Sequence, residues 1–204
     1  MTPRKKRKRA KNFQSAFIVA YDLPSENIKA LGTQVRRDSV NSVRSYSSQL
    51  FHSLGAQTTE SVILVSPARE SNIKPIIETV KRMYQSLHDE FFSKGLDLDL
   101  VPIIEVIGLS TKQRKQYEAL AIRYIENKAV ACAKYLTRVE HKLEKSRSQK
   151  QILRLIFNLE KYRKTWEEIQ RLTSELALSN DWHIPRILAD IDKLLNQLHT
   201  HVSE

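Results

Sequence analysis

The residues best suited to binding chemistry in this sequence are a run of cations near its beginning. Seven of the 34 lysine and arginine residues fall within the first eleven positions. A tethered cluster of positive charge neutralises several phosphates at once and releases their counterions, which gives salt-sensitive binding that is indifferent to base sequence. We therefore predict that a basic arm contacts nucleic acid through Arg4, Lys5, Lys6, Arg7, Lys8, Arg9 and Lys11.

The rest of the chain is only mildly basic. The formal net charge is +11 over 204 residues, and the 27 basic and 23 acidic residues beyond the arm leave about +4 of it. Closely spaced like charges repel one another and bury nothing, so we expect residues 1–12 to be disordered. The run also suits a nuclear import signal, if the source is eukaryotic, or a solubilising tail.

Three arginines further along could extend the track of the arm. Arg36, Arg37 and Arg44 lie near the start of a predicted helix, and we include them among the candidate nucleic-acid contacts. Acidic residues are interspersed among the cations of this region. An ordinary solvated surface is therefore the alternative interpretation.

Asp22 is the one candidate metal ligand. It follows a short apolar run and should stand at the end of a buried strand, where α/β folds form ligand crevices, so it could hold Mg²⁺. Such a site would suit a metal-dependent nuclease. The alternative is that Asp22 caps the turn that leads into Pro24.

Other classes of site are poorly represented. Cys132 is the only cysteine, the six histidines are scattered, and the sequence has no GxxxxGK[ST], GxGxxG or GxSxG motif. We therefore expect no cofactor and no enzymatic reaction. With no apolar run of about eighteen residues, we also expect an intracellular protein that does not associate with membranes, cytoplasmic or in the nucleoid, or nuclear if eukaryotic.

The apolar pattern of residues 13–109 predicts an α/β domain. Short β-prone runs at 17–21, 59–65 and 98–107 alternate with helical patterns at 38–54 and 72–94. With right-handed crossovers, this order predicts a small three-stranded, mainly parallel sheet with two helices packed on it. Pro102 removes one ladder hydrogen bond and argues for an edge or a bulge in the last strand.

Residues 110–204 predict a helical domain, with a long helical hairpin or bundle and a terminal helix. Ser110 and Gln113 form a capping-box pattern that opens the first long helix. Apolar residues then follow a heptad spacing along 152–176, which suits either an antiparallel hairpin or the seam of a homodimer. If these helices bind another protein instead, the chain is an assembly scaffold and the basic arm serves only as a targeting signal.

Three short stretches resemble a known pair of families. They are the run from Phe17 to Pro24, the helix end Leu54-Gly55-Ala56, and the run from Ser61 to Pro67. Residues 17–67 resemble the opening of the ferredoxin-like CRISPR-adaptation proteins and the related C-terminal domain of the phenylacetate-pathway repressors. The resemblance implies a role with nucleic acid, and it implies that Asp22 occupies the position of the proposed metal-binding aspartate.

Together these features predict a non-enzymatic nucleic-acid-binding protein. The basic arm would supply phosphate contacts, and the helical region would supply dimerisation or assembly. The alternatives are a metal-dependent nuclease centred on Asp22 and a protein-assembly scaffold with an import-like tail.

Overall fold

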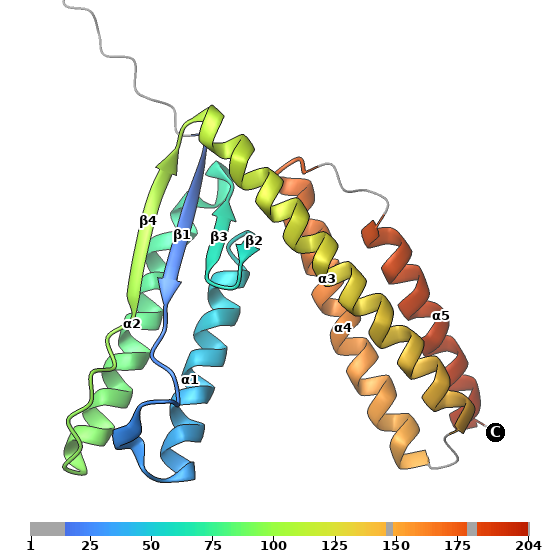
Figure 1. The fold of residues 1–204 in the computed structure, drawn as a ribbon, viewed down its shortest axis with the longest axis horizontal. Coiled ribbons are helices and arrows are strands. Elements are labelled where there is room, and N and C mark those ends of the chain that lie inside the picture. The colour runs from blue at the N-terminus through green and yellow to red at the C-terminus, as the bar shows by residue number, and fades with distance from the viewer. Residues whose placement is uncertain (1–14, 146–148, 179–182, 204) are drawn as a thin grey trace, which may run out of the picture.

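Two parts joined by one continuous helix make up the structure. The computed structural model describes residues 15–145, 149–178 and 183–203. A sheet part and a helical part diverge from the common helix as an inverted V (Figure 1). The expectation of a mixed α/β protein that ends in long helices is confirmed. The basic arm lies outside the described residues.

The sheet has four strands, and the prediction of three mainly parallel strands is wrong. The strands are β1 (Ala16–Asp22), β2 (Ala56–Thr59), β3 (Val62–Val65) and β4 (Ile103–Leu109). They lie in the order β2-β3-β1-β4, and every neighbouring pair is antiparallel. The predicted single strand at 59–65 is a hairpin with a two-residue turn at Glu60 and Ser61.

The hairpin explains why the sheet is antiparallel. Each crossover helix joins two parallel strands, β1 to β2 and β3 to β4, but a strand of the other pair lies between them. This interleaving is the β-α-β-β-α-β arrangement of ferredoxin-like folds. It is a property of the fold, which supports many functions, and the resemblance to the two named families stays a prediction.

Two helices cover one face of the sheet. The 3₁₀ turn η1 (Lys29–Leu31) leads to α1 (Gln34–His52), and η2 (Pro67–Arg69) leads to α2 (Glu70–Ser93). Phe51 of α1 and Tyr84 of α2 are fully buried against the strand residues Val19 and Ile63. Pro102 lies just before β4, so the proline costs no ladder bond within the strand.

The opposite face of the sheet receives the long helix α3 (Thr111–Lys145). Ser110 and Gln113 form the predicted capping box, in which the backbone nitrogen of Ser110 donates to Gln113 Oε1 at 3.0 Å. Ala121 of α3 is fully buried against the strand residues Ile18 and Leu64. The first half of α3 is therefore part of the core of the sheet.

The second half of α3 belongs to a three-helix bundle with α4 (Gln149–Glu175) and α5 (His183–Ser203). Heptad residues of α4, such as Leu159 and Trp166, are buried there against α3 and α5. The hairpin alternative therefore accounts for them, and the homodimer stays a prediction. Along the described ranges, no helix is long and apolar enough to cross a membrane.

Two arginines fasten the bundle to the sheet part. Arg114 of α3 donates to the carbonyl of Ser15 at 3.1 Å and to that of Leu176 at 3.0 Å. Arg69 forms a two-pronged ion pair with Glu175 at the end of α4, and it also donates to the carbonyl of Ser53 at 2.7 Å. Charge-assisted, bidentate contacts fix geometry more strongly than single hydrogen bonds.

Gly55, at the entry to β2, offers a stability test of the hairpin. A Cβ atom at this position would collide with the backbone carbonyl of Leu64, which cannot rotate away. We expect Gly55→Ala to lower the free energy of unfolding by about 3 kcal/mol, the upper end of overpacking costs. Gly95→Ala is the control, because its φ of +76° adds strain without any atom nearby, and it should cost about 1 kcal/mol. Urea unfolding measures both, and equal losses would contradict the collision.

Candidate nucleic-acid interface

The three predicted arginines of α1 do not form a single track. Arg36 is half-buried, and its Nη1 donates to the carbonyl of Leu31 at 3.5 Å. Arg37 and Arg44 are exposed, and their i, i+7 spacing places them on one side of α1. Of the three, Arg44 lines the same cavity as Asp22.

Asp22 is exposed at the end of β1, where it pairs with Ile103 of β4. It lines a cavity of about 480 Å³ together with Arg44 and His52. In the described part of the chain, no group of three or more His, Cys, Asp or Glu residues is arranged to hold a metal ion. The magnesium site therefore stays a prediction; among the described residues, Glu60 is the one other carboxylate that lines the cavity with Asp22.

A polar cluster that the sequence analysis missed lies beside Asp22. Lys128 of α3 donates to Gln57 Oε1 of β2 at 3.1 Å, and Gln57 Nε2 lies 2.6 Å from His52 Nε2 at the end of α1. With its oxygen toward Lys128, the Gln57 amide presents its N–H to His52.

Tyr21 of β1 is the remaining member of this polar cluster. Its hydroxyl donates to the carbonyl of Glu60 at 3.0 Å, and its oxygen lies 3.0 Å from His52 Nε2 and 3.3 Å from Ser48 Oγ. The ring stacks on Phe51, with 4.4 Å between centroids. Strand, hairpin turn, α1 and α3 are thus tied together at one point.

Burial sets the electrostatics of this cluster. Desolvation, reinforced by the charge of Lys128, lowers the pKa of His52 to about 4, so the imidazole is neutral at pH 7. Burial also lowers the pKa of Lys128, partly opposed by Glu60, and raises the pKa of Tyr21. The Lys128 ammonium lies 5.0 Å from the centre of the Tyr124 ring and has no ion pair with any carboxylate that the structure describes.

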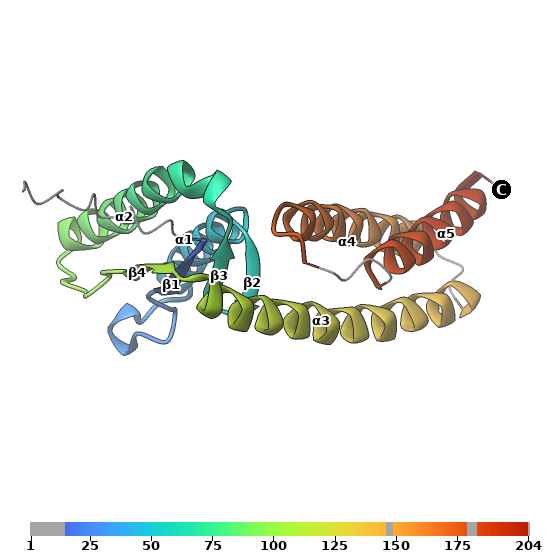
Figure 2. The ribbon, with the colours of Figure 1, turned by 90° about the horizontal axis from the view of Figure 1, so that it is seen from above.

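Lys128 also begins a row of cations along one flank of α3. The spacing of three, four and seven residues places Tyr124, Tyr135, Arg138 and Lys142 on the same flank. Tyr135 stacks on Tyr162 of α4, with 4.6 Å between ring centroids, so this flank faces α4. The helix α5 packs on the side of the bundle remote from the sheet part (Figure 2).

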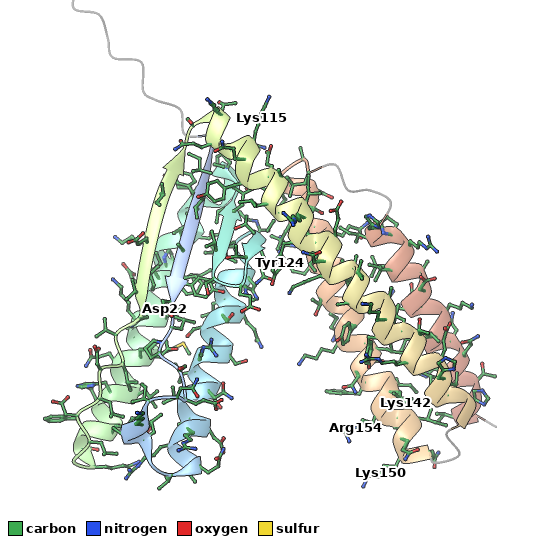
Figure 3. All side chains as sticks on the ribbon, in the orientation of Figure 1. Asp22, Lys115, Tyr124, Lys142, Lys150 and Arg154 are labelled. Carbon is green, nitrogen blue, oxygen red and sulfur yellow. The ribbon has the colours of Figure 1, made fainter. Side chains whose placement is uncertain are left out.

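The helix α4 supplies more cations beside this stack. We call these cations of α3 and α4 the cationic face; its basic members are Lys128, Arg138, Lys142, Lys150, Arg154 and Lys161, and the seven-residue spacing from Lys161 places the carboxylate of Glu168 on the same side of α4. Figure 3 shows Lys142, Lys150 and Arg154 at the end of the bundle that is remote from the sheet, whereas Tyr124 lies close to the sheet. The face therefore runs along the length of the bundle.

None of the six cations of this face has an ion pair with a carboxylate of the described chain, unlike Arg163, which binds Asp192 at 2.8 Å, and Arg171, which binds Glu175 at 2.9 Å. Exposed lysines elsewhere on the bundle, such as Lys134 and Lys193, also have no ion pair there, so the face is distinguished by the grouping of its cations. The carboxylates of α3 between Tyr124 and Lys142, Glu126 and Glu140, fall on the other flank by their spacing. The positive charge of the face is thus left open to an external anion.

The sequence held a usable signal for this face. Tyr124, Lys128, Tyr135, Arg138 and Lys142 recur at intervals of one or two helical turns within a predicted helix. What the sequence could not show is that α4 brings its own row of cations beside them. Apolar residues reveal which helix faces pack together, because those faces must be buried. Exposed polar residues give no such information, so the sequence could not predict which cations lie close to one another.

The comparisons with known proteins supply no identification. No family model matches the chain, and neither a curated protein nor a solved structure is significantly similar to it.

His52 gives the polar cluster a measurable pH signature. In the unfolded chain a histidine binds its proton near pH 6.5, whereas folded His52 does so only near pH 4, so lowering the pH between these values favours unfolding. We expect a loss of about 2 kcal/mol across this window, after allowing for partial solvent screening. His52→Gln should remove that part of the pH dependence, as measured by urea unfolding at pH 7 and pH 4.5. The exposed control His201→Gln should retain it, and the same pH slope in both variants would contradict the burial of neutral His52.

Proposed function

We propose that this chain binds nucleic acid without catalysing a reaction, through the cationic face of α3 and α4 and through the basic arm. The observation that carries the proposal is the set of six cations on one face of the bundle that have no ion pair among the described residues. Fixed, unneutralised charge of one sign is what a phosphate backbone requires of its partner.

Aromatic rings support nucleic acid over other polyanions. Tyr124 lies beside Lys128, whereas Tyr135 and Tyr162 stack on each other between α3 and α4, and Tyr135 also packs against the core of the bundle. Bases stack on aromatic side chains, and grooves that combine cations with aromatic rings are typical of single-strand binding.

The shape of the molecule also supports the proposal. Arg44 lines the cavity beside Asp22, and that cavity shares His52, Tyr124 and Lys128 with the surface of α3. Figure 1 shows α1 of the sheet part and α4 of the bundle on the two inner sides of the V. A bound strand could contact both parts at once.

The cationic face can be tested by charge removal. We expect the triple variant Arg138→Gln, Lys142→Gln, Arg154→Gln to weaken oligonucleotide binding and to reduce the slope of log K against log salt by about 2, since each lost phosphate contact contributes about 0.7 for a single strand. Fluorescence anisotropy over a salt series measures both. The matched control is Lys81→Gln, Arg186→Gln, Lys193→Gln, which removes the same charge elsewhere. Equal effects from the two triples would mean that only net charge matters.

The arm is tested separately by deleting residues 1–12. If the seven cations of the arm contact phosphate, the deletion lowers both affinity and salt slope while leaving the thermal midpoint unchanged. Combining the deletion with the triple variant should lower the slope further than either change alone. Unchanged affinity and slope after deletion would remove the arm from the interface.

A further inference from the structure

A cavity of about 410 Å³ lies where the cationic face meets the sheet part. The end of α1, β2, α3 and α4 all contribute to its walls. Figure 3 places Tyr124, one of the lining residues, at this junction. The volume falls within the range of small-molecule sites, which are mostly apolar with a few convergent polar groups.

The walls of this cavity combine two chemistries. Ile125, Ile169 and Leu172 supply an apolar floor, beside the ring of Tyr124. Three lysines surround it, Lys128 from α3 and Lys161 and Lys164 from α4. The matching ligand therefore has a flat apolar portion and a compact anionic group.

The positive charge of the cavity is not cancelled from within. Its single lining carboxylate, Glu168, is engaged by Arg171 of the same helix. Lys128 is held in place by Gln57 and by the Tyr124 ring, so little side-chain entropy remains to be lost on binding. His52, which also lines the cavity, adds no compensating negative charge.

We propose that this cavity binds one nucleoside phosphate, with the base on the apolar floor and the phosphate among Lys128, Lys161 and Lys164. The inference rests on the proposed function and deepens it by naming the unit that is recognised. A nucleoside phosphate can come from two sources, a free mononucleotide or one unit of a bound strand. Both present the same base and phosphate to the cavity.

The decisive variant is designed to fill the cavity from an exposed position of α4. Thr165 is exposed on α4, lines the cavity and uses its hydroxyl only for the carbonyl of Lys161. Thr165→Trp should occupy the space of the base and weaken binding at least about tenfold. Leu153→Trp is the matched control, because Leu153 is also exposed on α4 but does not line the cavity.

Two titrations separate the sources of the ligand. Calorimetry with adenosine 5′-monophosphate tests a free nucleotide, and anisotropy with a short single-stranded oligonucleotide tests a strand unit. Loss of mononucleotide binding in Thr165→Trp alone supports the first source. Loss of oligonucleotide affinity in Thr165→Trp alone, without mononucleotide binding by the native chain, supports the second.

Charge variants test the phosphate end of the site. Lys164→Gln should weaken binding of adenosine 5′-monophosphate or the oligonucleotide more than Lys193→Gln, which removes the same charge from α5, outside both the cavity and the cationic face. Equal effects of the two lysine variants would overturn the assignment of the phosphate to this cavity.

The outcomes also distinguish this inference from the proposed function. If the native chain ignores the mononucleotide and Thr165→Trp leaves oligonucleotide affinity intact, the cavity is not a nucleotide site, while the cationic face remains an interface. If the chain binds no oligonucleotide at all, the proposed function fails. The mononucleotide titration then decides the cavity by itself.

Discussion

The rest of the structure depends on one helix being shared by two hydrophobic cores. Ala121 of α3 is buried under the sheet, and Val139 of the same helix is buried in the bundle. A continuous helix transmits orientation along its length, because its backbone hydrogen bonds resist bending. Arg114 and the Arg69–Glu175 pair then fix the near end of α4 against the sheet part. The position of every cation on the bundle follows from this docking.

The docking also explains why Lys128 stands where it does. The turn of α3 that carries Lys128 passes over β2, and Gln57 of that strand receives the ammonium group. Because Gln57 is neutral, it orients the lysine without cancelling its charge. A carboxylate at this position would have closed the site with an internal ion pair. The amide instead leaves the half-buried Lys128 ammonium unneutralised at the junction of the two parts, where its charge can attract an anionic ligand.

The sequence predicted what apolar periodicity controls. The helices α2 and α3 follow from their buried stripes and from the capping box at Ser110, because the cost of exposing such a stripe is large. The sequence did not predict the hairpin of β2 and β3, because its turn, Glu60-Ser61, contains no Gly, Asn or Pro to interrupt the strand pattern. Because this turn was not predicted, β2 and β3 were treated as one strand, and the strands were predicted to run parallel when they are antiparallel. The sequence also did not predict the polar cluster around His52, because its residues come from β1, α1, β2 and α3, and no local sequence pattern links these elements.

The arm and the cationic face would serve different purposes in one binding event. If the arm is disordered, as its sequence predicts, it loses conformational entropy on binding a strand, so it would contribute reach and association rate more than geometry. The face is already ordered by the bundle core and by the Tyr135–Tyr162 stack, so its contacts incur little of that loss. Because both are tethered to one body, engagement of either raises the effective concentration of the other. Under the proposed function, selectivity for a particular nucleic acid would therefore reside in the face and its cavity, where position is fixed, and the arm would mainly increase affinity.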